Sequence, residues 1–521
     1  MSKLSLKVVL RLGKGAFLAV LMSAATTLSA SANGWEHWGI PLKILLDTLD
    51  GDDPGYRLRA ARSLGFRRER SALPRLLQML RDSEERPRVR IEVAQALGRI
   101  GDQRAIAGLI EVLRTDPREE LRGAAATSLG HLAIESAAKP LIIALDTEQN
   151  LMVQIDIVSA LGSFKHPTVV AALSEILESE KNTSLHRKAI IALGRSSAPE
   201  AATPLLEALR VARNDSERAT IVTALGRIAN TKARPDLENL FDATKSPMLK
   251  VQVAAALGAI RDGSVVPKLI EMLDDDLAAV RFFAVDALAA AKDTSATVPL
   301  RLLYRRATAA ASASLEEPLS RQSIATFLAE QSLRVAVIRA LTALEPKESI
   351  GEFLNAAVPH EKPRTSALGL RLNEGIFELR RAALVGLGYS RTKAATNFLT
   401  KSGVLSDRDF RLRATALRAL GILRDPISAS AVVALLDDGI AEVRWVAAKV
   451  LGRLGNAAMA QEIRQHLDDP HPEVRRQAAL SLGYLKYRES CPNLVKLSKR
   501  DETKAVREAA SMTLAHLCTN D

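Results

Sequence analysis

The sequence predicts an all-α protein, a solenoid of about fourteen two-helix repeats. Two observations predict it: a ten-residue phrase that returns at a nearly fixed interval, and an amphipathic helix before each copy. The phrase stands as VRIEVAQALG at 89–98, VRWVAAKVLG at 443–452 and VRRQAALSLG at 474–483. Neither helix of such a pair can bury its apolar face alone, so consecutive pairs have to stack on one another.

The phrase marks the second helix of each repeat. Its copies end at positions 65, 98, 130, 162, 194, 226, 258, 289, 342, 388, 421, 452, 483 and 515. The residue before the end position is Leu in all fourteen copies, and the end position is Gly in eleven. Apolar or small residues nine, five, two and one positions before the end fall on one helical face. We expect the Gly to stop the helix, because Gly adopts positive φ without a clash, and the small residues to admit a neighbouring helix.

The first helix of each repeat precedes the phrase, as in LPRLLQML at 73–80 and VPKLIEML at 266–273. Proline is tolerated in the first turn of a helix, where its missing N–H would lack a partner anyway. The prolines that mark this position are Pro74, Pro140, Pro204, Pro235, Pro267, Pro299 and Pro492.

A basic residue stands eight positions before the end of twelve copies. Gln154 and His186 interrupt the row, and acids such as Asp437 and Asp438 cluster in the preceding turns. One interpretation is an anion-binding stripe. The other, which we favour, is a ladder in which each cation bonds turn carboxylates and carbonyls, because a guanidinium fork suits carboxylate pairing. The row consists of Arg57, Arg90, Arg122, Arg218, Lys250, Arg281, Arg334, Arg380, Arg413, Arg444, Arg475 and Arg507.

Residues 1–32 have the pattern of a secretory signal peptide. Four cations, Lys3, Lys7, Arg11 and Lys14, precede the short apolar run 16–28 and the small residues SASA. Cleavage after Ala32 would lower the formal charge from +12 to +8, because those four cations are lost. The alternative is an uncleaved anchor, but the run is shorter than the roughly 20 residues that a spanning helix needs. We therefore expect an exported protein, periplasmic or extracellular, with no integral membrane segment after cleavage.

The two cysteines both lie in the last repeat. Cys491 starts its first helix and Cys518 follows its second, and these two ends are neighbours in an antiparallel helix pair. Because an exported protein meets an oxidising compartment, we hypothesise a Cys491–Cys518 disulfide; two free buried thiols are the alternative.

The repeats divide into an N-terminal series at 33–303, a segment at 304–376 with two insertions, and a C-terminal series at 377–521. The insertions, 304–325 and 358–375, are predicted to be loops, with some helix in the first. Trp35 and Trp38 precede the first helix, and we expect them to cover the end of the stack.

The repeat, with P-x-L-x-x-L, a turn Asp and V-R-x-x-A-A-x-A-L-G, resembles the HEAT-like repeats of the phycobilisome-lyase type. VPKLIEMLDDDLAAVRFFAVDALA at 266–289 and ALLDDGIAEVRWVAAKVLG at 434–452 carry the pattern most fully. The resemblance covers nearly all of 42–517. It implies a curved, right-handed superhelix with the second helices on its concave side. The family includes scaffolds, bilin lyases and subunits of larger machines.

No catalytic arrangement is evident. The sequence has no Gly-rich phosphate loop, no H-E-x-x-H and no C-x-x-C. HLDDPHPE at 466–473 fits the repeat's turn better than a metal site. We therefore expect no catalytic residue, no cofactor and no metal.

The candidate site is a surface on the second helices of repeats nine to thirteen. Positions seven and three before the end of the phrase lie off its buried face, and there the chain places cations and an exposed Trp. Trp and Arg are enriched among binding hot spots, although an ordinary solvated face is the alternative. The surface consists of Arg339, Arg381, Arg418, Trp445, Lys449 and Arg476.

These observations predict an exported, non-enzymatic scaffold that binds a protein partner or an anionic envelope component. The alternative is a nucleic-acid-binding or lyase-like enzymatic repeat protein. Only the Arg excess favours it, with thirteen Arg between Arg57 and Arg104, and export argues against it.

Overall fold

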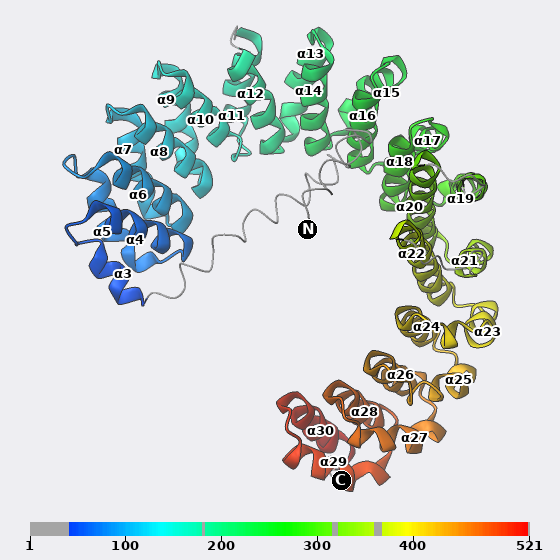
Figure 1. Cartoon of the computed structure of the whole chain (residues 1–521). Coiled ribbons are helices and arrows are strands. Elements are labelled where there is room, and N and C mark those ends of the chain that lie inside the picture. The colour runs from blue at the N-terminus through cyan, green and yellow to red at the C-terminus, as the bar shows by residue number, and fades with distance from the viewer. Residues whose placement is uncertain (1–40, 180–182, 315–320, 359–366, 519–521) are drawn as a thin grey trace. The chain divides into compact units, whose positions relative to one another are not determined.

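The computed structural model describes residues 41–179, 183–314, 321–358 and 367–518. These ranges contain 28 α-helices, α3 to α30, joined by turns and short 3-10 segments, and no strand (Figure 1). The all-α prediction is confirmed. The expected signal peptide and the two end-covering tryptophans, Trp35 and Trp38, lie outside the described residues.

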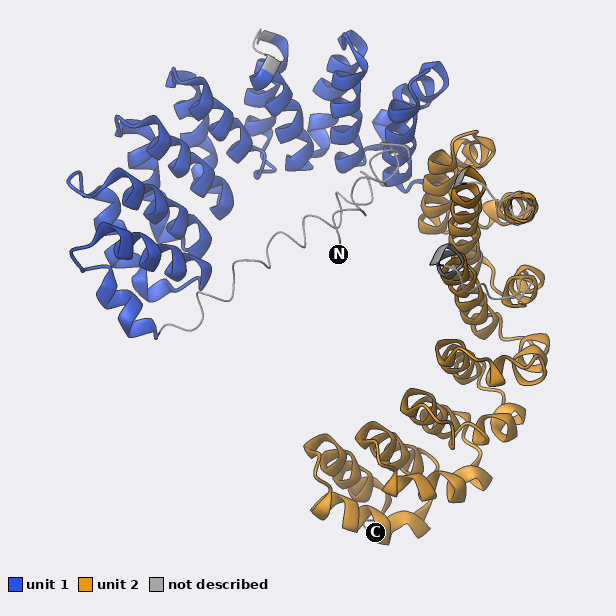
Figure 2. Cartoon of the chain, in the orientation of Figure 1, with its two compact units in different colours: residues 1–265 blue, residues 266–521 orange. Residues whose placement is uncertain are grey.

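The chain divides into two compact units, Met1–Val265 and Val266–Asp521 (Figure 2). The helices of each unit pair in chain order, seven pairs to a unit, which agrees with the fourteen copies of the phrase. The first helices of unit 1 are α3 (Leu42–Thr48), α5 (Leu73–Arg81), α7 (Ile106–Thr115), α9 (Ala138–Thr147), α11 (Pro167–Ser179), α13 (Ala202–Val211) and α15 (Arg234–Ala243). Its second helices are α4 (Pro54–Phe66), α6 (Pro87–Ile100), α8 (Glu119–Leu132), α10 (Leu151–Leu161), α12 (Thr183–Ser196), α14 (Asp215–Ile228) and α16 (Pro247–Ile260).

Unit 2 repeats the same arrangement. Its first helices are α17 (Val266–Glu271), α19 (Thr297–Ala313), α21 (Ile350–Ala357), α23 (Lys393–Lys401), α25 (Ala429–Val433), α27 (Ala460–Gln465) and α29 (Cys491–Arg500). Its second helices are α18 (Ala278–Ala291), α20 (Arg321–Leu344), α22 (Ala367–Ser390), α24 (Phe410–Leu423), α26 (Ala441–Leu454), α28 (Pro472–Tyr484) and α30 (Lys504–Leu517). All seven prolines noted in the sequence lie within the first three residues of a first helix.

Each unit has two layers: the odd-numbered first helices form the outer one and the even-numbered second helices the inner one (Figure 1). The core lies between the layers and between successive second helices. The leucine one position before the end of the phrase is 0–1% exposed in thirteen of the fourteen repeats, from Leu64 to Leu482. Leu514, in the last repeat, is half-buried. Full burial of such a side chain contributes roughly 1.5–3 kcal/mol, so this column is a principal source of the stacking energy.

The phrase's final Gly does not stop the helix, and that part of the prediction is wrong. Gly98 lies inside α6, which ends at Ile100 and is capped by Gly101 with φ of 76°. The left-handed residue recurs three positions after the phrase, as at Ala133, Arg424 and Gly455. Most of these residues are not Gly, so the stop depends on position rather than on residue type.

The phrase's Gly instead permits close approach of successive second helices, as expected for the small residues. A Cβ built on Gly130 would lie 2.7 Å from the Cα of Ala160, and one on Gly194 would lie 2.7 Å from the Cα of Ala224. Since real Cβ atoms essentially never come this close to backbone, these two contacts require Gly. Three copies have Ala289, Thr342 or Ala515 at this position instead.

The described residues of the two insertions are mainly helix, which corrects the loop prediction. Residues 304–313 continue α19, and 367–375 form the start of α22. The added turns have a small core of their own, in which Phe327 is fully buried beside Ile324 and Leu372. Apolar residues at helical spacing in these segments are buried against one another, so the segments extend the helices of their repeats.

Candidate functional site

The structure brings the six predicted surface residues onto one layer of unit 2. They come from five second helices that follow one another in the stack, α20, α22, α24, α26 and α28. Arg418 of α24 and Lys449 of α26 meet at the indole of Trp445, with the guanidinium carbon 5.8 Å and Nζ 5.9 Å from the ring centroid. A cation over an aromatic face is attracted by the ring quadrupole.

Trp445 is half-buried, not exposed as the sequence suggested. The aliphatic stems of long cationic side chains cover apolar neighbours while the charged heads reach water. In this surface the charged groups of Arg418 and Lys449 themselves lie near the ring. A ligand would therefore meet two cations beside a partly exposed aromatic side chain.

Carboxylates that sequence reasoning missed accompany the arginines of this surface. Arg381 bonds Glu378 at 2.7 Å, and Arg476 bonds Glu473 at 2.8 Å, each pair three residues apart on one helix. Arg418 pairs with Glu442 of the next repeat at 2.8 Å, and Arg339 lies 3.5 Å from Glu378. The i,i+3 spacing was visible in the sequence and could have revealed two of these acids.

The pairing makes this surface mixed in charge rather than plainly basic. The hydrogen bond from Arg476 lowers the pKa of Glu473, although burial opposes it, so the acid stays charged beside its partner. Among the described residues no carboxylate lies within ion-pair distance of Lys449, whose printed neighbour is Trp445. The Trp445–Lys449–Arg418 group is therefore the part of the surface best suited to receive a ligand.

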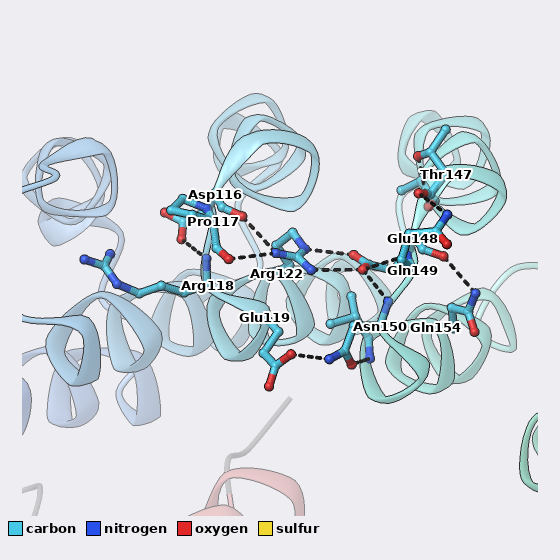
Figure 3. Close-up of polar contacts among 12 residues, drawn as sticks. Asp116, Pro117, Arg118, Glu119, Arg122, Thr147, Glu148, Gln149, Asn150 and Gln154 are labelled. Atoms are coloured by element: carbon cyan, nitrogen blue, oxygen red, sulfur yellow. Dashed lines mark hydrogen bonds and ion pairs between the residues drawn. The ribbon is translucent and has the colours of Figure 1, made fainter.

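The basic row forms a structural ladder, as favoured over the anion-binding stripe. In Figure 3, Arg122 donates to the backbone carbonyls of Asp116 and Pro117 in its own repeat. Its other two nitrogens hold the carboxylate of Glu148 in the next repeat, at 2.8 and 2.9 Å. One guanidinium thus joins two successive turns.

The same rung recurs in both units, with nitrogen–oxygen distances of 2.7–2.9 Å. The pairs are Arg57–Glu85, Arg90–Asp116, Arg122–Glu148, Arg281–Glu330, Arg380–Asp407, Arg413–Asp438, Arg444–Asp469 and Arg475–Asp501. Most of the carboxylates also accept a backbone N–H of their own turn, as Asp469 does from His471 at 2.7 Å. These guanidinium groups are occupied, so the row serves stability and not ligand binding.

Six of the fourteen positions depart from this pattern. Arg218 pairs with Asp215 of its own helix at 3.1 Å, Lys250 lies over the ring of Phe241, and Arg507 of the last repeat donates to the carbonyls of Asp501 and Glu502.

The other three are Gln154, His186 and Arg334. Gln154 donates only to the backbone carbonyl of Glu148, at 2.8 Å. His186 lies 3.3 Å from Glu217 of the next repeat. Arg334 is buried over the ring of Tyr304 and bonds Gln331, without a carboxylate partner among the described residues. Its repeat is the one lengthened by the first insertion.

Acid is expected to weaken the ladder. The fork of Arg122 holds the pKa of Glu148 below its ordinary 4.5, although burial opposes the shift. Burial alone would raise the pKa of Asp438, but hydrogen bonds from Arg413 and from the Ile440 N–H outweigh it and the net shift is downward. Because these folded-state pKa values are depressed, their stabilisation is complete above the unfolded pKa values and is lost as pH falls through the folded ones.

We therefore expect the urea midpoint to fall between about pH 5 and pH 3. The Arg122→Met, Glu148→Leu double variant removes one rung and should show a shallower fall. A midpoint that stays constant over this range would contradict the assignment of the ladder as a stabilising element.

Cys491 and Cys518 are joined by a disulfide in the structure, and no described cysteine is free. The bond ties the start of α29 to the residue after α30 and closes a loop with a separation of 27 residues. A loop of this size stabilises by about 3–4 kcal/mol in the chain-entropy model.

We expect Cys491→Ser, Cys518→Ser protein to lose protection from amide hydrogen exchange in α29 and α30 first. Thiol labelling of denatured, unreduced wild type should modify neither cysteine; two labelled cysteines would contradict the pairing.

The HLDDPHPE turn at 466–473 supplies one carboxylate of the ladder. Asp469 accepts a hydrogen bond from Arg444 at 2.8 Å, and His466 Nδ1 lies 3.9 Å from the same carboxylate. No group of three or more His, Cys, Asp or Glu side chains in the described part of the chain could hold a metal ion. Within that part, too, no helix combines the length and apolar character needed to cross a membrane.

Comparison with known proteins identifies the repeat. The family described as HEAT repeats matches residues 42–130, 138–225, 204–289, 365–442 and 431–515. No curated protein matches the sequence.

Several solved structures share the fold. A structure of Kap95p binding RanGDP has a TM-score of 0.56 and 15% identity, over 92% of this chain and 72% of that one. A Kap95–Nup1 complex has a TM-score of 0.55 and 14% identity, and the match covers 93% of this chain and 73% of that one. A structure of importin beta has a TM-score of 0.54 and 13% identity, over 91% of this chain and 77% of that one. At such low identity the likeness concerns the fold alone. The matched segments account for most of the sequence, and the chain belongs to the HEAT-repeat family.

Proposed function

We propose that this chain is an exported, non-enzymatic scaffold that binds a protein or an anionic component of the cell envelope through the second helices of unit 2. HEAT-repeat solenoids are generally protein-binding scaffolds, which supports the class of function. Export rests on the signal-peptide pattern of residues 1–32. The phycobilisome-lyase subtype remains a resemblance of the repeat and carries no activity here.

The observation that carries the proposal is the Trp445–Lys449–Arg418 group. It combines a partly exposed indole with two cations within 6 Å of the ring centroid, and truncation of such residues at interfaces often costs about 2 kcal/mol or more. The neighbouring glutamates, Glu442 and Glu473, restrict the choice of ligand. A partner must present its own anions to compete for the paired guanidinium groups, while its apolar surface packs on the indole.

Several arginines that favoured the nucleic-acid alternative are already paired with carboxylates of the chain. Within the Arg-rich stretch, Arg62 and Arg99 share Glu92, and Arg104 pairs with Asp102 at 2.8 Å. A phosphate backbone would have to displace these carboxylates. Strong salt-dependent binding of DNA by the purified protein would favour the alternative instead.

The test compares proteins captured from the envelope fraction by tagged wild type and by the Trp445→Ala, Arg418→Ala variant. The Tyr56→Ala, Arg59→Ala variant is the matched control, because Arg59 also lies 5.8 Å from an aromatic centroid, but in the first repeat. We expect the captured partner to be lost only with the unit 2 variant. Identical capture by wild type and this variant would show that the surface is wrong, and an intact N-terminus on cytoplasmic protein would show that export is wrong.

A further inference from the structure

Two cavities on the inner layer of unit 1 are lined by equivalent positions of the repeat. The first, of about 430 Å³, lies along α8 and α10. The second, of about 480 Å³, lies along α14 and α16. They are three repeats apart, and neither belongs to the surface of unit 2.

Small side chains open both cavities at the same place. Seven positions before the end of the phrase stand Gly123 and Ala219, and three positions before it stand Thr127 and Thr223. The repeat of α12, which lies between the two cavities, carries Arg187 at the first of these positions instead.

An exposed methionine from the next repeat flanks each cavity. Met152 is 65% exposed and Met248 is 63% exposed. Methionine is flexible and polarizable, and adapts to varied ligands. The shared lining therefore offers two similar pockets on one face.

The first cavity is acidic. Glu119, Glu120 and Asp156 line it, and no Lys, Arg or His does. Asp156 is half-buried, and its carboxylate has no hydrogen-bond or ion-pair partner in the described chain. Burial raises the pKa of Asp156, which Lys188 opposes, so a cation placed here would gain from a carboxylate that is already partly desolvated.

Gly123 keeps the carboxylate of Asp156 accessible. A Cβ built on Gly123 would collide with Oδ2 of Asp156. Any other residue would push this carboxylate out of its position or cover it. The geometry thus exposes an unpaired acid at the bottom of a groove, where a lysine or arginine side chain can reach it.

The second cavity has charges of both signs beside its apolar lining. Ile191, Met248 and Leu249 line it together with Asp215 and Arg227. At its wall Oε1 of Gln252 is buried without a hydrogen bond, and an unsatisfied acceptor of this kind costs about 1–3 kcal/mol. An apolar side chain would pack on Ile191, Met248 and Leu249 in this cavity.

The spacing of the cavities fits an extended chain. Packed helices lie about 8–10 Å apart, so three repeats span roughly 24–30 Å. An extended peptide covers about 3.3–3.6 Å per residue, and this span therefore takes roughly seven to nine residues.

We propose that the inner face of unit 1 binds an extended segment of a partner protein. The segment places a Lys or Arg side chain in the first cavity and an apolar side chain in the second, about eight residues away. The first cavity is lined by acids and by no cation, whereas the surface of unit 2 mixes cations with acids, so this site adds a second class of ligand to the scaffold.

The test selects 15-residue peptides from a random phage-displayed library on the full chain, then measures the affinity of synthetic, fluorescein-labelled winners by anisotropy. We expect winners to combine a basic and an apolar residue about eight positions apart. Asp156→Asn, Glu120→Gln should weaken them at least tenfold. Glu200→Gln, Glu207→Gln removes the same charge from exposed positions on the outer layer and should leave affinity within twofold.

A second variant tests the other cavity. Ala219→Arg introduces the side chain that the repeat of α12 carries at this position, so the fold should tolerate it, and circular dichroism checks this. Affinity for the same peptides should again fall. Winners without a basic residue, or affinities unchanged by both unit 1 variants, would overturn the proposal. Binding lost only with Trp445→Ala, Arg418→Ala would also overturn it, while leaving the proposed function intact.

Discussion

Asp116→Ala is expected to lower the free energy of unfolding by about 3–5 kcal/mol, because it leaves a buried guanidinium without its counter-charge. The Arg90 and Asp116 side chains are each 6% exposed and lie 2.8 Å apart. Arg90 also donates to the carbonyl of Leu80 at 2.9 and 3.0 Å, which holds the fork in place after the carboxylate is gone. The charge cannot reach water without unpacking the turn.

The matched control is Glu111→Ala. Glu111 pairs with Arg81 at 3.3 Å, and both side chains are more than half exposed. Exposed pairs contribute at most about 1 kcal/mol, so little change is expected. The measurement is urea unfolding followed by circular dichroism.

A double variant tests the reason for the loss. Arg90→Met, Asp116→Leu removes both charges and should recover most of the stability, since a buried ion pair replaced by apolar residues is often neutral. If Asp116→Ala were as mild as the surface control, the buried rung would not be a stabilising contact. If the double variant were as unstable as the single one, lost packing rather than an unpaired charge would be the cause.

Gly130→Ala is expected to destabilise unit 1 by about 1–3 kcal/mol, although Ala forms helix better than Gly by up to roughly 1 kcal/mol. The new Cβ would lie 2.7 Å from the Cα and 2.8 Å from the Cβ of Ala160. The obstacle is the backbone of α10, which cannot rotate away as a side-chain end could. The two second helices would have to separate, which also disturbs the leucine column.

Gly351→Ala is the control for helix propensity. Gly351 lies in α21, and a Cβ there would meet nothing within 4 Å. This variant should be unchanged or slightly more stable. Thermal melting of both variants distinguishes the effects, and a Gly130→Ala protein as stable as wild type would rule out close helix approach as the role of this Gly.

The sequence was sufficient for everything that depends on periodicity. Spacing along one chain determines which residues share a helix face, so the helix pairs and the buried leucines from Leu64 to Leu482 followed directly. The basic row could be assigned to a ladder for the same reason: acids recur in many of the turns, mostly 25–28 residues after the cation that they pair with. The prediction that Cys491 lies next to Cys518 needed only the antiparallel geometry of one helix pair.

The predictions that failed, on the phrase's Gly and on the insertions, concern contacts between repeats. The role of the phrase's Gly could not be read from its own helix, because the atoms that it must avoid, such as those of Ala160, lie in the next repeat. The insertions were misread as loops because their apolar residues find partners only in three dimensions, around Phe327.

The tertiary structure also decided the character of the binding surfaces. On unit 2 the cations were predicted, but the neighbouring acids turn a basic row into a mixed face, because side chains of adjacent helices compete for the same charge. On unit 1 the carboxylate of Asp156 can occupy its position in the cavity because Gly123 of the preceding repeat has no Cβ to collide with it. A repeat's sequence determines its own helices, and the register between neighbouring repeats determines what their shared surface can bind.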